Sequence, residues 1–322
     1  MKAAVVEKIR DARVLEVEDP KTLPGSMKIR VEACAVCGSD LRIFTKGDPR
    51  ATFPRIIGHE IAGTIVELGE GTTGYAVGDR VCVAPGHGCG ECKYCKNDMG
   101  NVCVNPQPSI GYASSGGFAQ YIVPPVNVVK NGFVNRIPDN LSFEEASMSE
   151  LLACCINAQE RAMVGEGDTV LVIGPGPAGC MHIQLARARG AKKVLLSGRT
   201  PGRLQKAAER FHPDAVFTEQ GDALVERVLA ETDGLGADVV IVAAPSHETQ
   251  EVAIKLAAPR GRVNFFGGLP KDNCISHIEA NIIHYKEVML TGASSSLGRQ
   301  SREARQLISE GKVKASDYIT HR

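Results

Sequence analysis

Apolar and polar residues alternate with a period of two in the first part of the chain. The apolar residues are Met27, Ile29, Val31 and Ala33, and the polar residues between them are Lys28, Arg30 and Glu32. This pattern is typical of a strand with one buried face. Two further short apolar segments, at residues 61–68 and 80–83, are bounded by glycine-containing turns. We therefore expect a β-rich barrel or sandwich with long loops in this part of the chain.

The pattern changes near residue 142, where Ser142 and Glu145 form a capping-box pair that predicts the start of a helix. From Asp168 onward, short apolar segments alternate with amphipathic ones. The predicted strands are residues 169–173, 193–197, 215–217, 238–242, 262–266 and 288–291, and the predicted helices are residues 181–189, 201–211, 223–231, 248–258 and 301–311. Apolar strands spaced by helices predict a doubly wound α/β domain, with a parallel sheet covered on both faces.

A glycine-rich loop joins the first of these strands to the first helix. Its sequence is Gly174-Pro175-Gly176-Pro177-Ala178-Gly179. Gly174 permits a tight turn, Gly176 lets the backbone approach a pyrophosphate, and Gly179 lets the helix pack closely on the sheet. The helix N-terminus offers free N–H groups to phosphates. A glycine-rich turn without a ligand is the alternative, but the surrounding strand and helix favour dinucleotide binding.

The end of the second predicted strand indicates which dinucleotide is preferred. An acidic residue there would bind the ribose 2′-hydroxyl of NAD and repel the 2′-phosphate of NADP. The chain instead has Ser197, Gly198 and Arg199, with Arg203 beyond. A guanidinium favours a phosphate, so we expect NADP(H) in preference to NAD(H). The alternative is that both arginines are solvated residues at the start of a helix.

Four cysteines are closely spaced in a lobe at residues 86–105. They are Cys89, Cys92, Cys95 and Cys103. Four thiolates at such spacing favour a closed, tetrahedral structural zinc site. Disulfides, an iron–sulfur cluster and a zinc-ribbon module that binds nucleic acid are the alternatives.

A second set of metal-ligand types is dispersed along the chain. Cys37 follows the first predicted strand, His59 and Glu60 precede the next, and Glu150 lies on the helix that leads toward the dinucleotide loop. One thiolate, one imidazole and one carboxylate leave a fourth position open, as in catalytic zinc sites. Spacing alone does not assemble this site, since Cys37 also forms a CxxC pair with Cys34, His59 fits a buried core histidine, and Glu150 fits a helix surface.

Composition narrows the class of protein. The 322 residues carry 37 Lys and Arg against 37 Asp and Glu, and no Trp. Zero net charge argues against a protein whose main function is to bind nucleic acid or an anionic membrane surface. No apolar run reaches the ~18 residues of a membrane-spanning helix. Without a signal-peptide pattern we expect a cytoplasmic protein with reduced thiols. The cysteines outside both clusters are expected to be small buried residues: Cys34, Cys82, Cys154, Cys155, Cys180 and Cys274.

Taken together, these motifs resemble the zinc-containing medium-chain dehydrogenases, the family of alcohol, sorbitol and threonine dehydrogenases. The resemblance covers nearly the whole chain and keeps the motif order: Cys37-Gly38-Ser39-Asp40, Gly58-His59-Glu60, Val77-Gly78-Asp79-Arg80-Val81, the four-cysteine lobe, Glu150 and the loop at Gly174. The polyol branch is most similar, because Glu150 stands where simple alcohol dehydrogenases carry a cysteine.

The resemblance implies a GroES-like catalytic domain at residues 1–152, a Rossmann domain at 153–290, and a return to the catalytic domain at 291–322. It implies a zinc-dependent oxidoreductase acting on a secondary alcohol or polyol, with two zinc ions per chain and assembly as a homodimer or homotetramer. Catalytic zinc would bind Cys37 and His59, with Glu60 and Glu150 as direct and exchangeable ligands in an undecided order. Asp40 would orient His59, and Ser39 would relay the proton.

The chain also departs from the family pattern. Arg42 stands where relatives often carry a histidine of the proton relay, and the sequence stops at Arg322, where relatives continue for one more helix and strand; we expect a missing tail. The alternative function is a quinone-reductase-like or non-catalytic nucleotide-binding relative with only the structural zinc.

Overall fold

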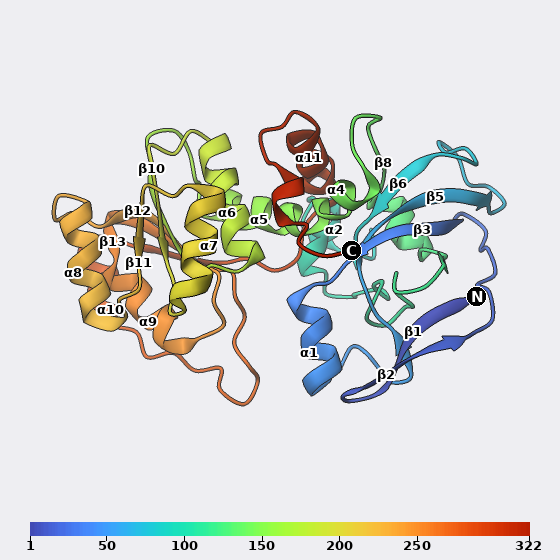
Figure 1. Ribbon diagram of the computed structural model, residues 1–322, viewed down its shortest axis with the longest axis horizontal. Helices are drawn as coiled ribbons and strands as arrows, with labels where there is room; N and C mark the ends of the chain where they lie inside the picture. Colours follow the sequence, from blue (N-terminus) through green and yellow to red (C-terminus); the bar gives the residue numbers. More distant parts are fainter. The chain divides into compact units, whose positions relative to one another are not determined.

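The computed structural model describes residues 1–322 and divides into two compact units (Figure 1). Unit 1 comprises residues 1–153, 295–311 and 318–322, and unit 2 comprises residues 154–294 and 312–317. The chain therefore leaves unit 1 after residue 153, returns to it at residues 295–311, contributes residues 312–317 to unit 2, and ends in unit 1. None of the helices combines the length and the apolar character needed to cross a bilayer.

Unit 1 is built on two antiparallel sheets. The larger has the strand order β7-β3-β5-β6-β8 and the smaller has the order β2-β1-β4. The strands are β1 (Lys2–Lys8), β2 (Asp11–Glu16), β3 (Met27–Ala35), β4 (Arg55–Ile56), β5 (Glu60–Leu68), β6 (Arg80–Val83), β7 (Tyr121–Ile122) and β8 (Val134–Arg136). The predicted alternation is confirmed at the start of β3, where Met27 and Ile29 are buried and Arg30 is exposed.

Short helices and long loops complete unit 1. The helices are α1 (Gly38–Lys46), α2 (Lys93–Lys96), α3 (Val126–Lys130), α4 (Phe143–Ser147) and α11 (Gly298–Ser309), with a 3₁₀ turn at Gly100–Val102. The capping box predicted at the start of α4 is confirmed: the Glu145 backbone N–H donates to the Ser142 hydroxyl at 3.2 Å. On the return to unit 1, α11 packs against α4, and the Asn140 side chain donates to the carbonyl of Ser309 at 2.9 Å. Helix α5 (Ser149–Arg161) begins in unit 1 and continues in unit 2.

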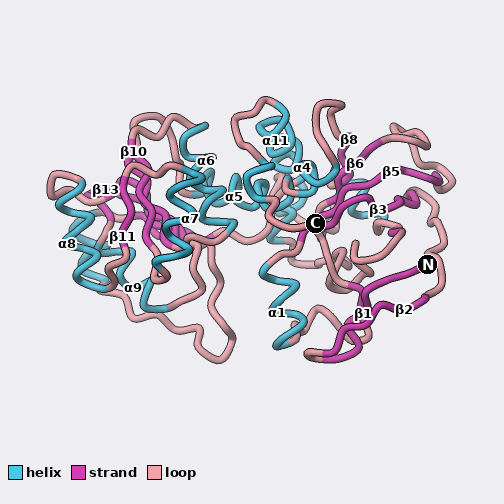
Figure 2. Tube along the Cα trace, viewed as in Figure 1, coloured by secondary structure: helices cyan, strands magenta, loops and turns pink.

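Unit 2 is a parallel six-stranded sheet of order β11-β10-β9-β12-β13-β14 (Figure 2). The strands are β9 (Thr169–Ile173), β10 (Lys193–Ser197), β11 (Ala215–Phe217), β12 (Ala237–Val242), β13 (Ala257–Phe265) and β14 (Met289–Gly292). The order reverses direction between β9 and β12, and in doubly wound folds ligands bind at this reversal.

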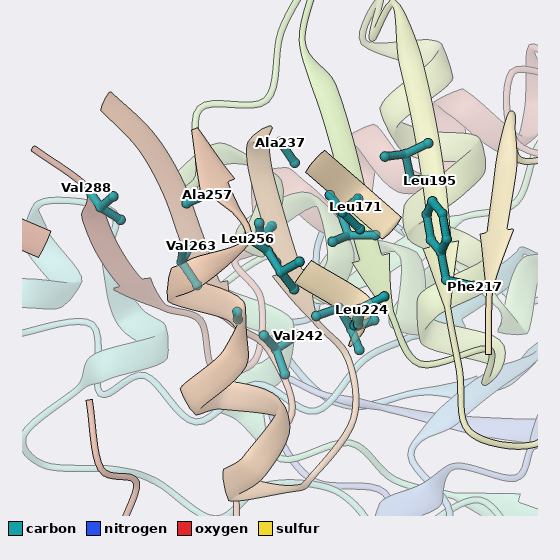
Figure 3. Packing of buried hydrophobic residues seen from close by; sticks show 14 residues of the cluster. Leu171, Leu195, Phe217, Leu224, Ala237, Val242, Leu256, Ala257, Val263 and Val288 are labelled. Carbon is teal, nitrogen blue, oxygen red and sulfur yellow. The ribbon is translucent and has the colours of Figure 1, made fainter. Parts of the chain in front are cut away.

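Helices cover both faces of this sheet. They are α6 (Pro177–Ala188), α7 (Pro201–Phe211), α8 (Gly221–Glu231), α9 (His247–Lys255) and α10 (Ala280–Lys286). Helices α6 and α7 pack together, as do α8, α9 and α10, and the strands run between these two groups. Under the second group, Leu171, Phe217 and Val263 belong to one continuous buried cluster (Figure 3).

Three sequence-based expectations need correction. Helix α9 ends at Lys255 rather than continuing to Ala258, because Ala257 and Ala258 already belong to β13. Cys274 is exposed, not buried, since it lies in the loop before α10. Cys34 and Cys154 are only partly buried, whereas Cys82, Cys155 and Cys180 are buried as expected.

Candidate active site and metal centres

The first candidate centre begins where β3 ends and α1 starts. Cys37 is the N-cap residue of α1, and its backbone N–H donates to Asp40 Oδ2 at 2.9 Å. The other carboxylate oxygen of Asp40 accepts from the backbone N–H of Gly58 at 3.2 Å. Asp40 is 2% exposed. A single buried carboxylate thus ties the loop of Cys37 to the loop that carries His59.

The structure brings together three of the four dispersed candidates. The donor atoms of Cys37, His59 and Glu60 all lie within 4.8 Å of one another. His59 and Glu60 are buried, because they directly precede and begin the central strand β5. Ser39, on the first turn of α1, places its hydroxyl 3.3 Å from His59 Nε2. His59 Nδ1 lies 3.3 Å from Asp40 Oδ1 but makes no well-aligned hydrogen bond.

Burial and mutual charge shift the pKa values of this cluster. Burial, followed by the like charge of Glu150, raises the pKa of Glu60 to about 8. Burial opposes protonation of His59, but the nearby side chains of Asp40 and Cys37 outweigh that effect and raise the imidazole pKa. Anionic groups buried together are costly unless a cation compensates them. Thiol, imidazole and carboxylate donors together fit a zinc ion with an open coordination position.

Glu150 lies near this cluster without joining the close set. It is the second residue of α5 and is 6% exposed. Its charge acts on both Glu60 and His59. The structure therefore separates the two carboxylates that the sequence left in an undecided order: Glu60 is grouped with Cys37 and His59, and Glu150 is outside that group.

The second candidate centre is the four-cysteine lobe. The Sγ atoms are 3.9 Å apart for Cys89 and Cys95, 3.6 Å for Cys92 and Cys95, and 3.8 Å for Cys92 and Cys103. Tetrahedral zinc with Zn–S bonds of 2.3 Å requires sulfur separations of about 3.8 Å. All four cysteines are free of disulfides. Backbone N–H groups, first that of Cys95, lower the pKa of Cys92 to about 6 and so favour the thiolate that binds metal.

The predicted dinucleotide loop connects β9 to α6. Gly174 has φ of 120°, which favours glycine, and a Cβ on Gly179 would lie 1.8 Å from the carbonyl oxygen of Gly174. Gly176 is the N-cap of α6, Pro177 follows at its first position, and a Cβ at Gly176 would meet nothing within 4 Å. The helix N-terminus therefore has open space beside it, as pyrophosphate binding requires.

The other predicted cofactor residues lie at the end of β10 and the start of α7. Ser197 is fully buried and its hydroxyl has no hydrogen-bond partner. Gly198 packs against Pro175, since a Cβ there would lie 2.5 Å from the proline ring. Arg199 and Arg203 are exposed. A pocket of about 200 Å³ opens beside Arg199, and it is lined by Arg199, Pro245, Ser246, His247, Glu248, Leu269, Pro270 and Asn273.

Comparison with known proteins agrees with this arrangement. Residues 23–136 match the alcohol dehydrogenase GroES-like domain, and residues 177–310 match the zinc-binding dehydrogenase family. The chain is 33% identical to sorbitol dehydrogenase of Halalkalibacterium halodurans, covering 100% of this chain and 92% of that protein. It is also 33% identical to L-threonine 3-dehydrogenase of Pyrococcus furiosus, covering 97% and 88% of the two chains. The chain belongs to the zinc-containing medium-chain dehydrogenase family.

Among the solved structures of relatives, one contains NADH and another contains NADP. An Escherichia coli alcohol dehydrogenase complexed with NADH has a TM-score of 0.88 and 29% identity over 98% of this chain and 90% of that one. A zinc-binding dehydrogenase from Sinorhizobium meliloti bound to NADP has a TM-score of 0.87 and 30% identity over 97% and 89%. The present chain is thus an NAD(P)-dependent zinc alcohol or polyol dehydrogenase.

This dehydrogenase has two residues at its candidate site that the sequence did not indicate. Tyr112 packs its ring 5.4 Å from the ring of His59, and the guanidinium of Arg50 lies 4.2 Å from the centre of the Tyr112 ring. Both come from loops without a recognisable motif, so only the fold reveals them. Arg42, in the position of the relay histidine, instead pairs with Asp48 at 3.3 Å.

Proposed function

We propose that this dehydrogenase interconverts a secondary alcohol or polyol and its ketone, with hydride transfer to and from NADP(H). The observation that carries the proposal is the buried group of Cys37, His59 and Glu60 donor atoms, with the Ser39 hydroxyl 3.3 Å from His59 Nε2. We assign residues 1–152 and 291–322 to the catalytic domain, with the zinc lobe at 86–105, and residues 153–290 to dinucleotide binding.

Each residue of the proposed catalytic site has a distinct role. Cys37, His59 and Glu60 hold the zinc, and Glu150 is the exchangeable or water-mediated ligand. Bound zinc supplies Lewis acidity toward an alcohol or carbonyl oxygen. Ser39 accepts the proton of the substrate hydroxyl and passes it on, and Asp40 orients the imidazole of His59. The hydride chemistry belongs to the nicotinamide cofactor.

For the cofactor, we propose that Gly174, Pro175, Gly176, Pro177 and Gly179 cradle the pyrophosphate at the start of α6. Ser197, Gly198, Arg199 and Arg203 are assigned to the 2′-phosphate of NADP. The pocket beside Arg199 supports this assignment. Glu248 works against it, because its negative charge acts on Arg199.

The zinc content of the protein and the substitution of Ser39 test the catalytic proposal. The wild-type protein should bind two zinc ions, and Cys37→Ala should bind one while losing turnover. Ser39→Ala should keep both ions but lower kcat by about 10²–10⁴-fold, the usual contribution of a positioned proton acceptor. Thr45→Ala is the matched control, because its hydroxyl donates only to the carbonyl of Leu41 at 2.7 Å on the same helix.

The readouts are elemental analysis for zinc and steady-state turnover of a panel of polyols, secondary alcohols and threonine with both cofactors. A single zinc per wild-type chain, bound by the cysteine lobe, would instead support the quinone-reductase-like alternative. Retained turnover in Ser39→Ala would remove Ser39 from the mechanism.

Cofactor choice is tested by reversing one charge. Arg199→Asp should shift the ratio of kcat/KM for NADP over NAD toward NAD, because an acidic residue there binds the ribose hydroxyls and repels the phosphate. Arg210→Asp, on the exposed side of the same helix α7, is the control and should leave the ratio unchanged. An unchanged ratio in Arg199→Asp would show that this guanidinium does not contact the cofactor phosphate.

A further inference from the structure

Arg50 is held close to the candidate catalytic site by the ring of Tyr112. Its guanidinium carbon lies 4.2 Å from the centre of that ring, and the ring in turn lies 5.4 Å from the ring of His59. The Tyr112 side chain also interacts electrostatically with both Ser39 and Arg50. A single aromatic side chain therefore separates this cation from the proposed zinc ligand and proton acceptor.

The position of Arg50 is set by a second anchor. Asp48 accepts two parallel hydrogen bonds from its guanidinium, Nε to Oδ1 and Nη2 to Oδ2, each 2.9 Å long. The turn that carries both residues is closed by the backbone N–H of Ala51, which donates to the carbonyl of Asp48 at 2.9 Å. The bonds from Arg50 lower the pKa of Asp48 to about 2, so the pair stays ionised. Most surface arginines are mobile, whereas this one is preorganised.

Positive charge exceeds negative charge around Arg50. Asp48 is shared between Arg50 and Arg42, so two guanidinium groups face one carboxylate. A guanidinium has five N–H donors, and Asp48 takes two of those of Arg50. The Arg50 side chain is 57% exposed, so its remaining donors include ones that an incoming group can reach.

We propose that Arg50 binds an anionic group of the substrate, so that the natural substrate is a secondary alcohol bearing a carboxylate or phosphate rather than a neutral polyol. This proposal rests on the function proposed above and names its substrate class. The acidic side chains of the candidate catalytic site, Glu60 and Glu150, offer no positive charge to an anionic group. An anionic group is favoured on the side of Arg50, where the planar fork of the guanidinium matches both carboxylate and phosphate oxygens.

Three probes with one carbon skeleton test this proposal. Sorbitol is neutral, gluconate carries a carboxylate, and sorbitol 6-phosphate carries a phosphate. Their dissociation constants are measured by calorimetry on the zinc-loaded, cofactor-loaded protein, and their turnover is measured in parallel. In the wild-type protein, gluconate or sorbitol 6-phosphate should bind at least ten-fold more tightly than sorbitol, and the comparison of the two anions identifies the preferred group.

Variants of Arg50 show whether it is responsible. Arg50→Gln should reduce the preference for the anionic probe by about ten-fold or more. Arg50→Lys keeps the charge but loses the planar fork, so its preference should lie between those of Arg50→Gln and the wild type. The matched control is Arg13→Gln, because Arg13 makes a similar two-bonded pair with Asp11 at 3.0 Å on the exposed strand β2. It should leave all three affinities unchanged.

The outcomes separate this proposal from the function on which it rests. Turnover of neutral alcohols without any preference for an anion overturns the role of Arg50 and leaves the dehydrogenase function intact. Selective, Arg50-dependent anion binding without turnover would support the role of Arg50 and overturn the dehydrogenase function. If Arg50→Gln does not fold, the Arg50→Lys series decides, because an undiminished preference in that folded variant shows that the guanidinium fork is not used.

Discussion

Two buried histidines show how neighbours decide the chemistry of one residue type. His59 is 3% exposed and lies beside the carboxylate of Asp40, and its pKa is raised. His182, in α6, is fully buried, with the Gln159 side chain 3.3 Å from its Nδ1 and the Phe266 ring 4.8 Å from its own ring. Burial, with a smaller contribution from Arg189, lowers its pKa to about 3. One imidazole lies among metal-ligand types, close to Cys37 and Glu60, and the other is a neutral part of the core.

This difference predicts an acid sensitivity that comes from His182. The folded pKa is about 3 and the ordinary value is 6.5, so the unfolded chain binds the proton first as the pH falls. The free energy of unfolding should therefore decrease below pH 6.5, by about 1 kcal/mol between pH 6.5 and 5.5 from this residue alone. His182→Leu should remove this pH-dependent contribution. The difference in free energy of unfolding between wild type and variant should therefore change by about 1 kcal/mol between pH 6.5 and 5.5.

Chemical denaturation followed by circular dichroism at both pH values provides the measurement, because the chain has no Trp to report by fluorescence. His212→Leu, an exposed residue at the end of α7, is the control and should leave the pH dependence unchanged. A wild-type and a His182→Leu protein that lose stability in parallel would mean that His182 does take up a proton in the folded state.

At this scale, the sequence predicted side chains within motifs and missed those brought in by folding. Cys37, His59 and Glu60 were proposed from motif context, although 21 intervening residues separate the first two. Arg50 and Tyr112 occupy loops whose conformation depends on packing among Ile43, Ile57 and their neighbours. No local pattern encodes such a packing arrangement, so these positions could be found only in the folded molecule.

Among the secondary-structure elements, buried parallel strands were the most predictable. The predicted limits of β9, β10 and β11 equal the observed ones, because each is a short apolar run with clear boundaries. Strand β13 was placed too late, since Pro259 lies inside it and suggests a break. The pairing with β12 has an irregularity at this point, which is where a strand tolerates proline. The hairpin of β1 and β2 was missed because its outer strand, β2, is mostly exposed.

The four-cysteine lobe depends on its metal more than on apolar packing. Its short helix α2 has no buried residue, nor does the 3₁₀ turn that follows. We therefore expect Cys92→Ser, or removal of zinc by a chelator, to unfold the lobe locally. Trypsin should then cleave after Lys93 or Lys96, which the folded zinc-bound lobe protects.

Limited proteolysis with mass spectrometry detects this cleavage. Cys274→Ser is the matched control, because Cys274 is exposed and outside both clusters, and it should be as resistant as the wild type. Equal resistance in Cys92→Ser and wild type would show that the lobe is stable without a complete set of ligands.

The parallel sheet of unit 2 ends in an edge strand, β14, that bears exposed apolar side chains. Strand β14 pairs only with β13, and its Met289 and Leu290 are 46% and 37% exposed. Exposed, uncharged edge strands tend to pair with another chain. We therefore expect β14 to contribute to the homodimer or homotetramer proposed from the sequence.

A double substitution, Met289→Lys with Leu290→Lys, places charges on that edge and should shift the protein toward monomers in size-exclusion chromatography with light scattering. The control is Val14→Lys with Leu15→Lys on β2, the edge strand of the small sheet in unit 1. An unchanged molar mass in the β14 variant would exclude this edge from the subunit interface.

The return of the chain to unit 1 has a consequence for biosynthesis. A ribosome releases residues 1–153 well before α11, whose residues complete the packing around Asn140 and α4. At 5–20 residues per second, that delay is on the order of ten seconds. During this time the nascent unit 1 exposes the surface that α11 later covers, while residues 154–294, all but the last six residues of unit 2, emerge as one continuous stretch and are free to fold first. The dinucleotide-binding half of the chain is therefore expected to become protease-resistant on the ribosome before the half that carries the zinc ligands.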